Sequence, residues 1–154
     1  MNNEAVIVTG AKETRGRLDA AARDLRDRTA MNRRMAAALY ATTMRNFQRQ
    51  SADGEPWAPL KPATVKWKAN RGYRMILQNT GALRQSFIPF HDRAIAGVGA
   101  QSRGKPDIAA IHQYGSRDGN IPARPMLPGE PVARSMAMKL YGTEVQIITR
   151  RANG

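Results

Sequence analysis

The longest stretch with a clear structural preference spans residues 12–50, which contain no proline and are rich in alanine, arginine, leucine and methionine. Residues of these types favour helix. Apolar side chains recur there at helical spacing in two stripes, first at Leu18, Ala21 and Leu25, and again between positions 35 and 47. The sequence therefore predicts a long helical region whose apolar stripes must pack against other parts of the chain.

Shorter segments around this region predict strands and breaks. A β-prone run at 5–9 precedes it, and Thr29 with Asn32 marks a break or an N-cap between two helices. Further along, 87–90 and 94–99 are predicted as two strands joined by a polar turn. This pairing predicts a small antiparallel sheet.

Glycine and threonine positions refine these elements. Gly97 and Gly99, at alternate positions of the second predicted strand, allow a close approach of another backbone or a bulge. Thr80 is expected to be the N-cap of a short helix. Gly115 is expected to follow the last residue of a two-turn helix at 107–114.

The C-terminal part predicts one more helix, over 130–141, which Gly142 can end. Residues 145–148 fit a helix or a strand, and 150–154 are expected to form a frayed tail. The predicted fold is therefore α+β, with a long N-terminal helical region packed on a small antiparallel β-sheet, a further C-terminal helix and proline-rich loops.

The length fits a single domain over residues 1–154. Its expected parts are a strand plus helical region at 1–50, a Pro/Trp loop at 51–75, a β-rich part at 76–128 that includes an extended arm at 116–128, and a C-terminal helix and tail at 129–154.

Two loops are rich in proline. At 51–62, three prolines and an Asp-Gly pair surround Trp57, which is predicted to anchor the loop on the core with its indole N–H paired to a carbonyl. In the arm, prolines at 122, 125 and 128 hold φ near about −65° and favour extended geometry in the residues before them. The arm is therefore predicted to be pre-extended, to have few backbone partners of its own, and to dock into a neighbouring subunit.

The formal charge of +13 comes from 25 basic and 12 acidic residues spread along the chain, which predicts no single patch. Such a surface suits a polyanion or an acidic protein, and the charge alone favours neither. Contacts with DNA or an acidic partner are considered for the basic residues around Trp67 and Tyr73, namely Lys66, Lys68, Arg71 and Arg74. A purely structural role, in which the aromatic rings hold the loop and the cations stay solvated, is favoured over base stacking.

No catalytic pattern emerges. The chain has no cysteine and two histidines, of which His112 is expected to be structural. It lacks a metal-ligand cluster, a phosphate-cradling glycine loop and a nucleophile elbow. The sequence therefore predicts a protein that is not an enzyme and carries no cofactor or metal. Neither a signal peptide nor an apolar run of transmembrane length is evident, so no membrane partner is expected.

Five motifs follow one another in a specific order. They are Asp53–Leu60, Thr64 with Lys66, Leu77–Ser86, Val98-Gly99 with Ala109–Gly115, and Ile121–Leu127. In this order they resemble the phage virion morphogenesis family, a group of tail-completion proteins of Mu-like phages. The resemblance covers residues 1–141, and each motif alone would be weak.

The resemblance implies a structural protein of a tailed bacteriophage or prophage, acting in tail completion or head–tail joining as a neck or tail-terminator ring component. It implies a homo-oligomeric ring, with a hexamer favoured over a dodecamer. The implied neighbours are head-side connector or adaptor proteins, tail tube or sheath proteins, and passing genomic DNA. Its place would be the neck of the virion, after assembly in the host cytoplasm. The alternative is a basic nucleic-acid-binding domain.

Within this picture the arm is expected to supply the subunit contacts, with Arg124 paired to a carboxylate of a neighbour. The expected contact residues are Ile121, Pro122, Arg124, Pro125, Met126 and Leu127. His112, Gln113 and Gly115 are expected to form the base of the arm.

Overall fold

A computed structural model describes residues 11–101 and 108–153. Its helices are α1 (Ala11–Arg26), α2 (Thr29–Arg49), α3 (Pro62–Ala69), α4 (Ala82–Gln85), α5 (Ile108–Tyr114) and α6 (Glu130–Asn153). Its strands form two antiparallel hairpins, β1 (Ser51–Ala52) with β2 (Glu55–Pro56), and β3 (Phe87–His91) with β4 (Ala96–Ala100). The α+β prediction is confirmed. The strand predicted at 5–9 lies outside the described residues.

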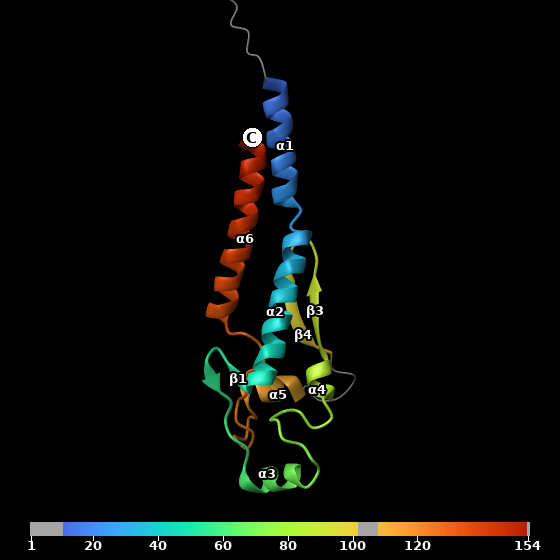
Figure 1. Ribbon diagram of the computed structural model, residues 1–154, viewed down its shortest axis with the longest axis vertical. Helices are drawn as coiled ribbons and strands as arrows, with labels where there is room; N and C mark the ends of the chain where they lie inside the picture. Colours follow the sequence, from blue (N-terminus) through green and yellow to red (C-terminus); the bar gives the residue numbers. More distant parts are fainter. Residues whose placement is uncertain (1–10, 102–107, 154) are drawn as a thin grey trace, which may run out of the picture.

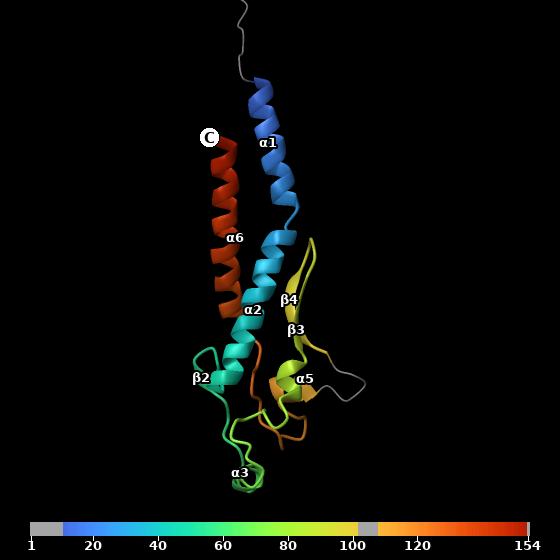
Figure 2. The same cartoon turned by 45° about the vertical axis from the view of Figure 1, so that its right-hand side comes forward.

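Helix α2 is the centre of an elongated molecule (Figure 1). The β3–β4 hairpin packs on one side of α2 and α6 on another, and α1 packs along the C-terminal half of α6 (Figures 1 and 2). The predicted break between two helices falls just before Thr29, where the Thr29 amide donates to Asp27 Oδ1 at 3.1 Å. Helix α3 lies at the end of the molecule away from α1.

The core lies at the C-terminal end of α2. Its cluster of buried residues consists of Phe47, Trp57, Phe87 and Met126, all at most 5% exposed. The Phe47 ring meets Trp57 edge-on with centroids 5.6 Å apart, and it meets Phe87 in the same way at 5.7 Å. Four distant segments of the chain therefore converge on one aromatic cluster.

The β3–β4 hairpin confirms both predicted strands and the turn between them. Phe90 pairs with Gly97, and a Cβ atom at Gly97 would collide with the Phe90 ring. The close approach predicted for this strand is thus made by a side chain and not by a backbone. Asp92, the aspartate at the turn, accepts hydrogen bonds from the backbone amides of Ala94 and Ile95. These bonds hold the pKa of its carboxyl group below the usual value.

Two predicted helix ends are wrong. Gly81, with φ of +79°, is the N-cap of α4, although Thr80 Oγ1 does accept from the Ala82 amide at 3.3 Å. Towards the C-terminus, α6 runs through Gly142 to Asn153, so 145–148, which fitted a helix or a strand, and 150–153 of the expected tail are helical. A glycine inside a helix costs about 1 kcal/mol. Packing of α6 against α1 and α2, which includes the buried Ile148, outweighs that cost.

Candidate functional site: the 116–128 segment and its surroundings

The proline-rich segment is docked on its own chain. Trp57 Nε1 donates to the Pro125 carbonyl oxygen at 2.6 Å, which confirms the predicted anchor, and Asn46 Nδ2 donates to the Met126 carbonyl oxygen at 3.0 Å. Gln113 Oε1 accepts from the backbone amides of Met126 and Leu127 at 2.8 and 3.1 Å. The expectation that this segment has few partners of its own is therefore wrong.

Arg124 is buried, with only 5% of its surface exposed. Its Nε donates to the Ala58 carbonyl oxygen at 2.8 Å and its Nη2 to the Pro59 carbonyl oxygen at 3.0 Å. Burial lowers the pKa of the guanidinium from its usual value. Arg124 thus joins the arm to the Trp57 loop, and this geometry replaces the expected pairing with a carboxylate of a neighbouring subunit.

The base of the arm is built by α5 and by a tight turn. The Arg124 amide donates to the His112 carbonyl oxygen at 2.6 Å, and Gly115, with φ of +86°, follows the helix as predicted. The loop is closed by Ser116, whose amide donates to the Ile121 carbonyl oxygen at 2.9 Å. Asp118 accepts from Ser116 Oγ and from Asn120, and these bonds lower its pKa to about 2.

Only part of the predicted contact set is left at the surface. Ile121, Pro122 and Pro125 are exposed, Leu127 is partly buried, and Met126 is 1% exposed. Sequence reasoning missed Asn46 as a partner of the arm. A signal was present, because Asn46 lies one heptad after Leu39, on the same face of the helix.

A small apolar cavity of about 170 Å³ opens beside the docked arm. It is lined by residues of β3, β4, α5 and the arm, including Phe87, Ala100, Ala109, Gln113, Tyr114 and Leu127. Tyr114 is 80% exposed. The surface around the arm therefore combines a shallow apolar hollow with an exposed aromatic ring.

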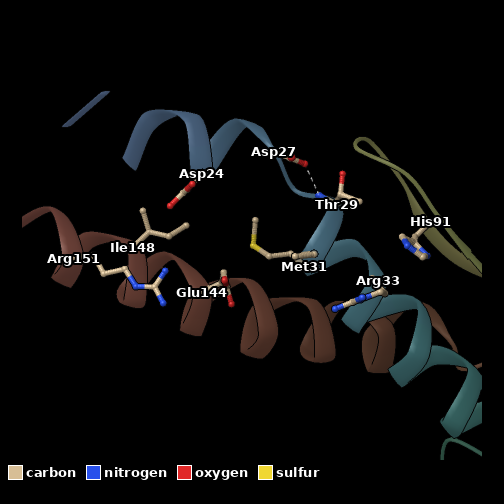
Figure 3. A pocket seen from close by; sticks show the side chains of 10 residues that line it. Asp24, Asp27, Thr29, Met31, Arg33, His91, Glu144, Ile148 and Arg151 are labelled. Atoms are coloured by element: carbon tan, nitrogen blue, oxygen red, sulfur yellow. Dashed lines mark hydrogen bonds between the residues drawn. The ribbon is translucent and has the colours of Figure 1, made fainter. Parts of the chain in front are cut away.

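A larger cavity of about 510 Å³ lies where α1, α2, α6 and the hairpin tip meet (Figure 3). Two of its carboxylates already have partners: Asp27 Oδ1 accepts from the Thr29 amide, and Glu144 Oε2 accepts from Arg34 Nη1 at 2.5 Å. Among the described residues, no group of three or more histidine, cysteine, aspartate or glutamate side chains could hold a metal ion. The cavity offers mixed charge without a reactive pair.

The predicted cationic residues lie at the far end of the molecule from α1. Lys66, Arg71 and Arg74 are exposed on α3 and the loop after it, whereas Lys68 is 5% exposed. The Lys68 ammonium donates to Asn79 Oδ1, and burial lowers its pKa. Lys68 is therefore removed from the expected contacts, because its side chain turns inward.

Four of the five motifs that suggested the resemblance meet at the aromatic cluster beside the arm, through Trp57, Leu77 with Leu83, Val98 with Ala109, and Met126 with Leu127. The motif of Thr64 and Lys66 lies apart from them on α3. A profile of the phage virion morphogenesis family matches residues 10–146. The chain belongs to this family. Over 113 residues it is 34% identical to the protein of Escherichia phage Mu named "Putative capsid assembly protein G", and the alignment spans 66% of this chain and 69% of the Mu protein. No solved structure shows a significant match.

Across residues 11–101 and 108–153 of this virion morphogenesis protein, no helix combines the length and apolar character that crossing a membrane requires. The family membership confirms the resemblance on which the functional expectations depend.

The half-buried His112 gives a pH prediction. Its Nδ1 atom is buried without a hydrogen-bond partner among the described residues, and its pKa is lowered by burial and by the nearby Arg124 charge. Because the folded state binds a proton less readily than the unfolded state, stability is complete above the unfolded pKa of about 6.5 and falls as pH drops through it.

Urea unfolding midpoints of the wild type are expected to drop on going from about pH 8 to about pH 5, and those of His112→Gln to drop less. His91→Gln, at an exposed position of β3, serves as the matched control and should behave like the wild type. An equal pH response in wild type and His112→Gln would refute the assignment.

Proposed function

We propose that this virion morphogenesis protein is a non-enzymatic structural component of a tailed bacteriophage or prophage, acting in tail completion and head–tail joining as a subunit of a ring in the neck. The ring is a hexamer, with a dodecamer as the other geometry. Its neighbours are head-side connector or adaptor proteins and tail tube or sheath proteins. Assembly takes place in the host cytoplasm and ends in the virion.

The observation that supports a ring is the exposure of large apolar side chains on two elements that flank α2 on different sides (Figures 1 and 2). On the hairpin, Ile88, Phe90 and Ile95 are 39%, 45% and 53% exposed. On α6, Met138 and Val145 are 71% and 43% exposed. Apolar patches on a soluble surface mark contact sites, and a closed ring needs two different surfaces on each subunit.

The hairpin surface can be tested by charge. The double variant Ile88→Glu with Ile95→Glu is expected to reduce the ring to monomers in size-exclusion chromatography with light scattering, because unpaired carboxylates at an apolar contact are costly. Leu18→Glu is the control, since Leu18 is 55% exposed on α1, away from the hairpin. It should leave the oligomer intact. A monomeric wild type, or a double variant that still forms the ring, would contradict the proposal.

A phage that lacks this gene provides the second readout. Complementation with the double variant is expected to give filled heads that carry no attached tails, whereas Leu18→Glu restores complete particles. The name of the Mu relative points to capsid assembly. A defect in forming heads would therefore support that role and count against a neck function.

A further inference from the structure

The chain contains an acid-free stretch that the overall charge count conceals. Residues 56–91 include no aspartate or glutamate, yet they carry Lys61, Lys66, Lys68, Arg71, Arg74 and Arg84. The expectation that the basic residues form no single patch therefore needs revision. In the fold this stretch includes the whole of α3 and the loop that follows it.

Helix α3 projects from the end of the molecule (Figures 1 and 2). Every residue from Pro62 to Trp67 is exposed, including Val65 at 52% and Trp67 at 43%. The one buried side chain of the helix is Lys68. Core packing thus accounts for very little of this helix, and the identity of its exposed side chains calls for a role at the surface.

One exposed cation at this end, Arg71, is held in place by an aromatic ring. The Arg71 guanidinium lies over the Trp67 ring, 4.4 Å from its centroid, and Arg71 Nη1 donates to the Trp67 carbonyl oxygen at 3.4 Å. Tyr73 lies beside Trp67 with ring centroids 6.2 Å apart, and its ring is 5.7 Å from the Lys68 ammonium. A guanidinium stacked on an indole keeps its N–H groups free at its edges and loses less freedom when an anion binds.

We propose that the basic tip, defined as Lys61, Lys66, Arg71 and Arg74, binds the phosphate backbone of duplex DNA. A duplex presents about one charge per 1.7 Å of its axis, so a convex set of cations can engage it without a matching groove. An acidic protein would have to place its carboxylates to fit this projecting helix. Single-stranded nucleic acid is less suitable because Arg71 already occupies one face of Trp67, which leaves a poor platform for base stacking.

The inference goes beyond the proposed function, because DNA binding by the tip can be disproved while the role in the ring still stands. The probe is a short fluorescent duplex of mixed sequence, titrated with the full chain at several salt concentrations and followed by anisotropy. The triple variant Lys66→Gln, Arg71→Gln and Arg74→Gln is expected to weaken binding at least tenfold at low salt. It should also reduce the slope of log affinity against log salt by about 2 to 3, since each lost phosphate contact removes about 0.9.

A matched control removes three exposed arginines from α1, by Arg15→Gln, Arg17→Gln and Arg23→Gln. Both sets lower the formal charge equally, so an equal loss of affinity would overturn the proposal in favour of diffuse charge. Trp67→Leu keeps the charge and is expected to weaken binding severalfold through the loss of the stacked Arg71. Circular dichroism and light scattering should show that the tip variant keeps its fold and its oligomeric state.

Unchanged affinity for DNA in the tip variant would also overturn the assignment. If that variant in addition failed to join tails in complementation, the partner of the tip would be an acidic protein.

Discussion

Replacing Met126 with alanine is expected to lower the free energy of unfolding by about 2–5 kcal/mol, the range found for large-to-small changes in cores. Met126 is 1% exposed and lies in the aromatic cluster with Phe47, Trp57 and Phe87. Its backbone also joins two hydrogen bonds of the docked arm, to Asn46 and to Gln113. The cavity left by the side chain therefore opens where the arm is attached, so the arm should loosen together with the core.

Urea unfolding at a fixed protein concentration measures this loss, because oligomerisation makes apparent stability depend on concentration. Leu18→Ala is the matched control: Leu18 is 55% exposed on α1, outside the two surfaces proposed for the ring, and its removal should change stability by less than about 0.5 kcal/mol. Limited trypsin digestion of Met126→Ala under native conditions should cut faster after Arg117 than it does in the wild type, whereas the Arg124–Pro125 bond resists trypsin in both proteins. Equal stability of Met126→Ala and Leu18→Ala would show that the arm is not part of the core.

The sequence correctly predicted features that depend on local chemistry. Trp57 has one donor and is flanked by prolines, so an anchored ring with its N–H on a carbonyl followed from the residue itself. The helix break before Thr29 and the left-handed conformation of Gly115 could likewise be predicted from neighbouring residues. Each of these needs only a few neighbouring residues to be decided.

The partner of the arm could not be predicted in this way. The prolines favour an extended backbone but do not specify what it packs on. The groups that hold it lie far away in sequence, with Asn46 eighty residues and Trp57 sixty-eight residues before their acceptors. An arm docked on its own core and an arm docked on a neighbour have the same local sequence pattern.

Tertiary packing also decided the features that were predicted wrongly. Gly142 would end an isolated helix, but α6 continues because it packs on α1 and α2. For Lys68, exposure depends on which side of α3 faces the rest of the chain. Helix α3 has exposed apolar and basic residues around most of its circumference, so its sequence gives no amphipathic pattern from which to choose a face.

The second large effect is expected at Trp57. Trp57→Ala should cost about 3–5 kcal/mol, because the ring fills the core beside Phe47 and only 5% of it is exposed. Trp57→Phe keeps most of the ring but removes the N–H group. It should cost about 1–3 kcal/mol, since the Pro125 carbonyl oxygen loses its donor at a partly buried position.

The second tryptophan of the chain supplies the control. Trp67 is 43% exposed on α3, so Trp67→Ala should change the urea midpoint far less than Trp57→Ala. Because each variant keeps a single tryptophan, the fluorescence of Trp57 and that of Trp67 can be measured separately. Unfolding is expected to shift the emission of Trp57 strongly to the red in the Trp67→Ala protein, and that of Trp67 only slightly in the Trp57→Phe protein. If the two positions responded alike, Trp57 could not be the residue that fixes the arm to the core, and the docked arm would have to depend on its contacts with Asn46, Gln113 and Arg124.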